Sequence, residues 1–208
     1  MRARSDQQKE RRRQDILDAA WELFQTQPYD AVTIATVARH AGIAKGTVYL
    51  YFKTKEELFA HIQAQQVALW FEDLDAQLTV ATGEVGAIAH LICASLVERP
   101  MLVQLLALLN VVLEQNIDYD TALMLKTTLR DHLLQTSALL EERLELAAGV
   151  GVRLLLQIYA VLIGLHQLAN PPAAVRQVHE RPDMALFSID FAAEFTRMIQ
   201  ILLHGGQV

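Results

Sequence analysis

Apolar residues recur at intervals of three and four along most of this chain, and this spacing limits its fold more than any other feature. Residues three and four apart lie on one face of a helix, so such stripes indicate amphipathic helices. Hydrophobic residues make up 52% of the 208 residues, enough to bury one core or two adjoining ones. The sequence therefore predicts an all-α protein. Its first stripe consists of Ile16, Ala19, Ala20, Leu23 and Phe24.

Two short helices follow, joined by a turn that contains glycine. Thr33 stands at the N-cap position of a helix that Gly42 ends, and a second short helix is expected over about Ala44 to Tyr51. This order is typical of a helix-turn-helix. Thr54 is expected to cap a long helix that opens at Lys55 and runs toward Thr79.

The spacing of apolar residues in the rest of the chain predicts stacked helices at about residues 85–98, 101–115, 119–146, 149–169 and 184–204. We expect about nine helices in two domains, a head over residues 1–54 and a body over residues 55–208.

Charge is unevenly divided, although the net charge is -6. Residues 1–60 hold 10 basic and 8 acidic residues, whereas the rest holds 8 and 16. A basic head on an acidic body is expected if the head contacts the phosphates of a nucleic acid. An acidic body can also serve solubility alone. The basic run of Lys9, Arg11, Arg12 and Arg13 indicates either a flexible arm in a minor groove or a solvated helix start that raises the local positive potential.

Membrane insertion and export are not expected. A membrane span needs roughly 18 consecutive apolar residues, and the best candidate, Leu154 to Leu165, follows Arg153 and contains Gln157. No apolar stretch follows the charged N-terminus. Cys93 is the only cysteine, which excludes an intramolecular disulfide and a cysteine cluster. A cytoplasmic location is predicted.

Motifs of catalysis are missing from the sequence. The seven histidines show no HxxxH or HExxH spacing, and Gly149-Val-Gly151 is a lone GxG preceded by a helical pattern. Neither a GxSxG elbow nor a P-loop is found. We therefore expect no enzyme, no metal site and no cofactor.

The helix-turn-helix carries a specific series of motifs. Residues 33–59 read TIATVARHAGIAKGTVYLYFKTKEELF, after IxxAAxxLF at residues 16–24. With VAxxAGI, KGTVYxYF and KEELF in order, this segment resembles the DNA-binding domain of TetR-family (tetracycline-repressor-like) transcriptional regulators. The resemblance implies a ligand-responsive regulator, more often a repressor, that binds a palindromic operator in double-stranded DNA as a homodimer. A helical interaction or ligand-carrier protein without specific DNA binding is the alternative.

The resemblance also implies which residues contact DNA, mainly at phosphates: Thr33, Lys45, Thr47, Tyr49, Tyr51 and Lys55. Gly46 leaves room for close backbone approach, and the apolar Leu50 suggests contact with a thymine methyl group. Val48 and Phe52 are expected to face inward. Ala44 stands where the family usually has serine, so an N-cap worth about 1 kcal/mol is missing.

Two further sites belong to the predicted body. Polar residues within apolar helices are candidates for binding a small, mostly apolar effector, although each can also be a satisfied core group or lie on an exposed face. They are His90, Cys93, Asn110, Glu114, Tyr159 and His166. Glu114 or His166 could alternatively form half of a cation site. The predicted dimer interface comprises the helix from Leu154 to Leu168 and a stripe of Phe187, Phe191, Phe195, Ile199 and Leu202, unless these residues fill the core of their own chain.

Overall fold

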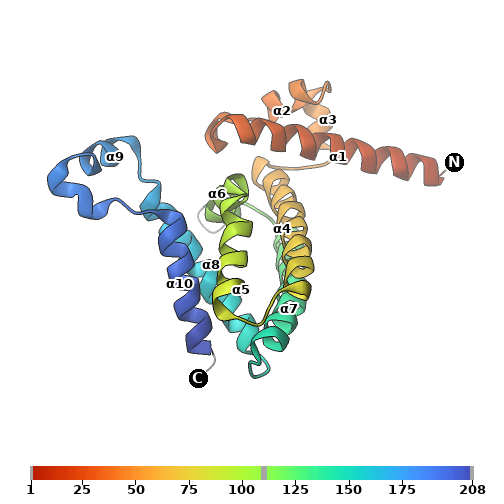
Figure 1. Cartoon of the computed structure of the whole chain (residues 1–208). Coiled ribbons are helices and arrows are strands. Elements are labelled where there is room, and N and C mark those ends of the chain that lie inside the picture. Colours follow the sequence, from red (N-terminus) through yellow and green to blue (C-terminus); the bar gives the residue numbers. More distant parts are fainter. Residues whose placement is uncertain (1, 109–111, 207–208) are drawn as a thin grey trace. The chain divides into compact units, whose positions relative to one another are not determined.

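The computed structural model describes residues 2–108 and 112–206, and these residues form helices and no strand (Figure 1). The all-α prediction is confirmed. The α-helices are α1 (Arg2–Thr26), α2 (Ile34–His40), α3 (Lys45–Tyr49), α4 (Lys55–Val80), α5 (Val85–Val97), α6 (Pro100–Leu108), α7 (Tyr119–Leu144), α8 (Val150–Ala169), α9 (Ala173–His179) and α10 (Phe191–Gly206). Short 3-10 helices cover Tyr29–Ala31 and Pro182–Phe187.

The chain divides into two compact units. The first unit, here called the head, contains residues 1–66 and 108–126, and the second, the body, contains residues 67–107 and 127–208. Helices α4 and α7 contribute residues to both units. The expected domain boundary between residues 54 and 55 falls at the start of α4 and stays a prediction.

The core of the head is aromatic. Phe24 of α1 meets Phe59 of α4 edge-on, with ring centroids 5.4 Å apart, and Tyr29 meets the same ring at 4.9 Å. Val48 and Phe52 are fully buried, as predicted. Burial of each such side chain contributes about 1.5–3 kcal/mol, so the short α3 is held by packing rather than by its own helix propensity.

Caps set the ends of α2. The Thr33 hydroxyl accepts a hydrogen bond from the backbone N–H of Thr36 at 3.2 Å, and the Thr36 hydroxyl accepts one from the backbone N–H of Thr33 at 2.9 Å. This reciprocal capping box satisfies two otherwise unpaired donors. Gly42 has a φ of 66°, the left-handed conformation that glycine adopts without steric cost. The predicted helix-turn-helix is therefore formed.

The body encloses one hydrophobic core. It collects side chains from α4, α5, α6, α7, α8 and α10, among them Phe71, Leu74, Ile92, Leu154 and Phe195. Helix α10 packs against both α8 and α5, and Figure 1 shows it alongside α8. Helix α8 is the one helix of the described part that is long and apolar enough to cross a membrane, yet it supplies four leucine or isoleucine side chains to this core.

Two predictions for the helices of the body need correction. The last helix begins at Phe191 and not at residue 184, because the Asp190 carboxylate accepts a hydrogen bond from the backbone N–H of Ala193 at 3.1 Å. Helix α9 was not predicted, since it buries none of its side chains and so has no apolar stripe. The described part of α6 runs to Leu108, and its predicted continuation toward residue 115 passes through residues 109–111, which lie outside the described residues.

Candidate nucleic-acid interface

Helix α3 presents an exposed face with an unusual composition. Val48 is fully buried, whereas Leu50 is 79% exposed and Tyr49 is 46% exposed. Lys45 and Gly46 are exposed beside them, and Thr47 and Tyr51 are half-buried. The Lys45 ammonium lies 5.8 Å from the centre of the Tyr49 ring. An aromatic, an aliphatic and a cationic side chain on one small glycine-containing face can contact base edges and phosphates.

The start of α3 lacks a side-chain cap. Ala44 occupies the N-cap position, and no side-chain hydrogen bond is formed there. This confirms the missing cap predicted from the alanine. Helix α3 is held instead by the buried Val48 and by the adjoining Phe52.

Lys55 points into the head. Its ammonium donates a hydrogen bond to the Tyr29 carbonyl oxygen at 2.6 Å and lies 3.6 Å from the centre of the Tyr29 ring. Burial lowers the pKa of Lys55 below its ordinary value. Burial, followed by the charge of Glu56, raises the pKa of Tyr29, whose hydroxyl donates to the Glu56 carboxylate at 3.3 Å. Lys55 therefore joins the start of α4 to the turn before α2.

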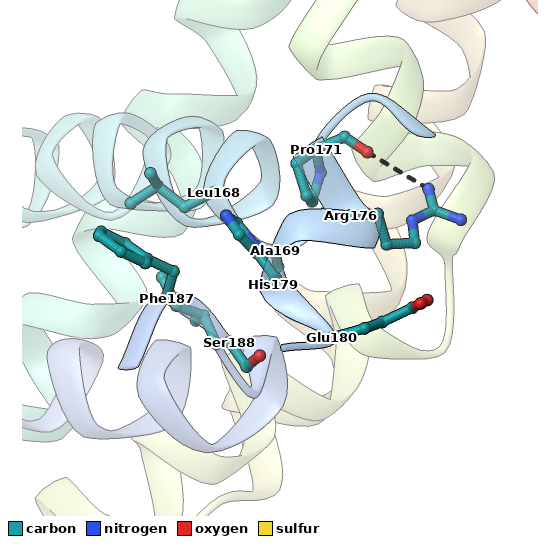
Figure 2. A pocket seen from close by; sticks show the side chains of 9 residues that line it. Leu168, Ala169, Pro171, Arg176, His179, Glu180, Phe187 and Ser188 are labelled. Atoms are coloured by element: carbon teal, nitrogen blue, oxygen red, sulfur yellow. Dashed lines mark hydrogen bonds between the residues drawn. The ribbon is translucent and has the colours of Figure 1, made fainter. Parts of the chain in front are cut away.

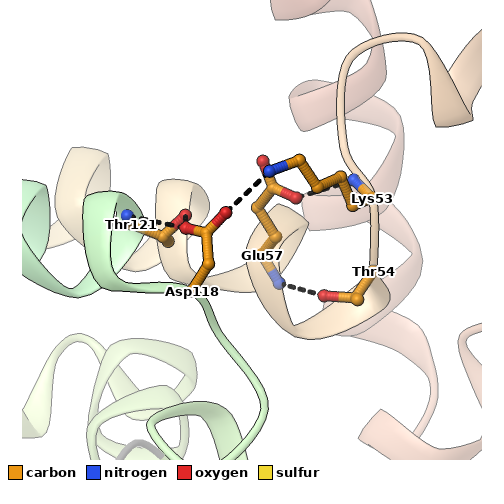
Figure 3. A network of polar contacts seen from close by, with 5 residues as sticks. All are labelled: Lys53, Thr54, Glu57, Asp118 and Thr121. Atoms are coloured by element: carbon orange, nitrogen blue, oxygen red, sulfur yellow. Dashed lines mark hydrogen bonds and ion pairs between the residues drawn. The ribbon is translucent and has the colours of Figure 1, made fainter.

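A polar network surrounds the turn between α3 and α4 (Figure 3). Thr54 accepts a hydrogen bond from the backbone N–H of Glu57 at 3.0 Å, and the Glu57 carboxylate accepts one from the backbone N–H of Lys53 at 2.6 Å. The Lys53 ammonium donates to Asp118 at 2.7 Å. Asp118 also caps α7 by accepting two hydrogen bonds from Thr121.

These contacts tie the turn to the start of α7. The hydrogen bond from Lys53, followed by those from Thr121, lowers the pKa of Asp118 below its usual range, and the same bond raises the pKa of Lys53. Sequence reasoning missed this pair because its members lie 65 residues apart. The caps at Thr54 and Asp118, by contrast, bind groups three residues away and so carry a local signal.

The basic run near the N-terminus is helical. Helix α1 begins at Arg2 and continues without a break, so the structure matches the alternative of a solvated helix start and not that of a flexible arm. Lys9, Arg11 and Arg12 are exposed. The Arg13 guanidinium lies 5.2 Å from the centre of the Phe52 ring.

The candidate effector residues are dispersed. His90 is exposed, and Cys93 is buried with its thiol 3.6 Å from the Ala192 carbonyl oxygen. Glu114 belongs to the head and pairs with Lys126 at 2.5 Å. The half-buried His166 has a pKa lowered by burial and faces the Asn170 side chain at 3.3 Å. Asn110 lies outside the described residues, and the Tyr159 hydroxyl lies 3.5 Å from the Leu106 carbonyl oxygen.

Other polar groups are buried in the body and were missed. Asp75 accepts hydrogen bonds from Thr136 at 2.6 Å and from Gln135 at 2.7 Å, which joins α4 to α7. The Trp70 indole donates to Ser95 at 3.0 Å. No group of three histidine, cysteine or acidic residues in the described ranges is placed to hold a metal ion.

A surface pocket lies between the end of α8, α9 and the 3-10 helix that follows (Figure 2). His179 stacks on Phe187 there, with ring centroids 5.6 Å apart. None of the candidate effector residues lines this pocket. Its lining consists of Leu168, Ala169, Pro171, Arg176, His179, Glu180, Phe187, Ser188 and Ile189.

The predicted dimer stripe divides into two groups. Phe195 and Ile199 are 0% exposed and belong to the core of their own chain, so they offer no surface to a partner. This matches the alternative left open for these residues. Phe187 is 49% exposed and lies on the 3-10 helix, whereas Phe191 and Leu202 are partly buried against the core.

Comparison with known proteins places these features in a family. Residues 16–62 match the family described as bacterial regulatory proteins, tetR family, and residues 64–208 match the tetracyclin repressor-like C-terminal domain. The fatty acid metabolism regulator protein of Bacillus subtilis is 31% identical over 71 residues, which are 34% of this chain and 37% of that protein. The regulator AcrR of Shigella flexneri is 36% identical over 62 residues, which are 30% of this chain and 29% of AcrR. The matches thus span about a third of these relatives.

Solved structures share the fold over nearly the whole chain. FadR from Bacillus subtilis in complex with stearoyl-CoA has a TM-score of 0.58 at 20% identity and covers 93% of this chain and 98% of its own. Thermus thermophilus FadR, a repressor in complex with lauroyl-CoA, has a TM-score of 0.56 at 20% identity, with coverages of 94% and 95%. From its two domain matches, the chain belongs to the TetR family of bacterial transcriptional regulators, proteins that act by binding DNA and not as enzymes.

Proposed function

We propose that this chain is a ligand-responsive transcriptional repressor that binds a palindromic operator as a homodimer in the cytoplasm. The observation that carries the proposal is the exposed face of α3, where Tyr49 and Leu50 project while Val48 and Phe52 anchor the helix. An exposed tyrosine and leucine beside an exposed lysine are suited to contact base edges and phosphates. In a helix-turn-helix, that face enters the major groove.

The proposed DNA contacts follow from exposure. Lys45 and Tyr49 are assigned to phosphates, and Leu50 to a thymine methyl group. Thr33, Gly46, Thr47 and Tyr51 complete the set and lie around the same helix-turn-helix. Lys55, the remaining predicted phosphate contact, is hydrogen-bonded to the Tyr29 carbonyl oxygen, so we assign it to holding this turn against α4 instead of to a phosphate.

The dimer is proposed to form through α8 and α10. One short recognition helix reads few bases, so paired heads are needed to read two half-sites about one helical turn apart. Leu156 of α8 and Ile201 of α10 are 48% and 53% exposed. Their helices pack together in the body, and partly exposed apolar residues extend both surfaces: Val152, Ile163, Met198 and Leu202.

A long-chain acyl-CoA is proposed as the effector. Two structures of the same fold are complexes with stearoyl-CoA and lauroyl-CoA. The core of the body is built largely from aliphatic side chains of α5, α6 and α8, the kind of surface that an acyl chain contacts. For such a ligand to release DNA, it must bind more tightly to the conformation that does not fit the operator.

The first test is selection of genomic fragments by the purified chain at moderate salt, followed by sequencing of the retained DNA. A shared palindrome, with each half-site mismatch costing about 1–3 kcal/mol, supports the proposal. Weak, salt-sensitive retention of all sequences favours the alternative of a helical carrier without specific DNA binding.

Site variants then test the assigned face. Tyr49→Ala is expected to abolish operator binding and leave the fold intact, because Tyr49 is not part of the core. Leu50→Ala is expected to weaken binding only to operators that have thymine at the contacted position. Arg153→Ala, an exposed residue of α8, is the control. Unchanged operator affinity in both α3 variants would show that the site is misassigned.

The effector is tested on the same operator fragment. Stearoyl-CoA at micromolar concentration is expected to release the bound DNA, whereas free coenzyme A is not. If both leave the complex unchanged while the operator is bound specifically, the acyl-CoA assignment is wrong and the DNA-binding function stands.

A further inference from the structure

The segment that contains the helix-turn-helix carries few positive charges. Residues 14–60, which include the whole helix-turn-helix, hold four basic and six acidic residues. A protein that binds DNA must neutralise phosphates with lysine or arginine, because these contacts supply most of the sequence-independent affinity. Within this segment, the helix-turn-helix itself holds only two basic residues, Arg39 and Lys45, and the six acidic residues flank it on both sides.

Two of these four cations are paired with other groups of the head, Lys53 at the surface and Lys55 at a half-buried position. Lys53 donates to Asp118 at 2.7 Å, and Lys55 donates to the Tyr29 carbonyl oxygen at 2.6 Å. Arg39 and Lys45 are the other two, and both are exposed. Two cations are few for an interface with a highly charged duplex, so further phosphate contacts must come from elsewhere in the chain.

The first three turns of α1 hold the missing charge. Residues 2–13 include six basic and two acidic residues. Residues 6–12 are all exposed and bury no apolar surface, although the helix is continuous from Arg2. Lys9 and Arg12 form no ion pair with any residue that the structure describes. Packing within the chain therefore does not explain this basic extension.

Arg13 fixes the direction of the extension relative to α3. Its guanidinium lies 5.2 Å from the centre of the ring of Phe52, the residue that follows the recognition segment. A helix turns by about 100° per residue. Lys9 therefore lies about 40° and Arg12 about 100° around the helix from Arg13, whereas Arg11 lies about 160° away. Lys9 therefore lies on the side that Arg13 turns toward the recognition segment, Arg12 lies at the edge of that side, and Arg11 lies on the opposite side.

We propose that Lys9 and Arg12 bind phosphates of the DNA backbone next to the site contacted by α3, which makes the start of α1 a second DNA-binding element. The proposal rests on the DNA-binding function proposed above. The contacts are made by a continuous helix and are independent of base sequence, since they go to phosphates. Affinity would then come largely from α1 and sequence preference from α3.

The test measures affinity at several salt concentrations. Full-length wild type, Lys9→Gln/Arg12→Gln and the matched control Arg11→Gln are titrated with two labelled duplexes, a fragment retained in the genomic selection and a random sequence of equal length. The slope of log K against log salt changes by about 0.9 for each phosphate that the protein no longer neutralises. For each DNA-binding head, the salt slope of the double variant is expected to be shallower than that of wild type by nearly twice this amount on both duplexes. The salt slope of Arg11→Gln is expected to equal that of wild type.

The outcomes separate the two proposals. Preference for the selected fragment over the random duplex must persist in the double variant, because α3 is untouched. If the double variant keeps the wild-type slope, or if Arg11→Gln loses as much slope per charge as the double variant does, α1 makes no defined contact and the inference is overturned. If wild type shows no preference for any fragment, the proposed function itself fails.

Discussion

Lys55 shows how neighbours decide the role of a charged side chain. Its ammonium is hydrogen-bonded to the Tyr29 carbonyl oxygen and covers the Tyr29 ring. We expect Lys55→Met to lower the free energy of unfolding by about 1–2 kcal/mol, because the variant cannot form this charged hydrogen bond at a half-buried position. Urea unfolding measures this change. Unchanged stability together with a smaller salt slope of DNA binding would instead make Lys55 a phosphate contact.

His61 makes the head sensitive to acid. Burial, followed by the charge of Arg13, lowers its pKa from 6.5 to about 4, while its ring lies edge-on to Phe52. The unfolded chain therefore binds the proton more readily, so stability is full above pH 6.5 and is lost as the pH falls toward 4. The free energy of unfolding falls by roughly 1–2 kcal/mol over this pH range, a value reduced to allow for the partial exposure of the ring.

Thermal unfolding between pH 7 and pH 4 measures this effect. His61→Leu is expected to unfold with a weaker pH dependence than wild type. The exposed His90, changed to Gln, serves as the control and should retain the full dependence. Equal pH dependence in His61→Leu and wild type would show that other groups cause the acid sensitivity.

At the scale of the elements, the contact between α7 and α8 explains the GxG sequence of Gly149 and Gly151, which resembles part of a dinucleotide-binding motif. Gly149 has a φ of 86°, and the Glu141 carboxylate accepts hydrogen bonds from the backbone N–H groups of Gly149 and Gly151 at 2.9 and 2.8 Å. A Cβ atom at Gly151 would lie 2.6 Å from the Ser137 carbonyl oxygen. The two glycines thus serve a helix start and a close helix crossing.

This crossing leads to a prediction with a control on the same helix. Gly151→Ala is expected to lower the free energy of unfolding by about 1–3 kcal/mol, because the methyl group meets backbone that cannot move aside. A methyl group added at Gly164 would have no atom within 4 Å, so Gly164→Ala should raise stability by up to about 1 kcal/mol. Denaturant unfolding compares the two. Equal effects would mean that the crossing is looser than the structure shows.

At the scale of the whole molecule, the open question is which surface joins two copies. Leu156→Glu and Ile201→Glu are each expected to weaken the dimer at least about tenfold, since a symmetric interface contains every substitution twice. Leu134→Glu, an equally exposed leucine of α7, is the control at 55% exposure. Sedimentation equilibrium measures the monomer–dimer constant. A dimer weakened by Leu134→Glu alone would move the interface to α7.

The sequence by itself determined the helical class, the helix-turn-helix with its Thr33 and Thr54 caps, and the family. These features depend on residues a few positions apart, and helix periodicity and capping act over that distance. The absent cap at Ala44 could be predicted for the same reason.

Only the tertiary structure decided which stripes are buried and which cations are free. Phe195 and Ile199 fill the body core instead of facing a partner, and Lys53 and Lys55 are bound by groups that sequence spacing does not reveal. Periodicity shows that a helix has an apolar face but not what covers that face. Burial and pairing are set by contacts between residues distant in the chain, which no local pattern encodes.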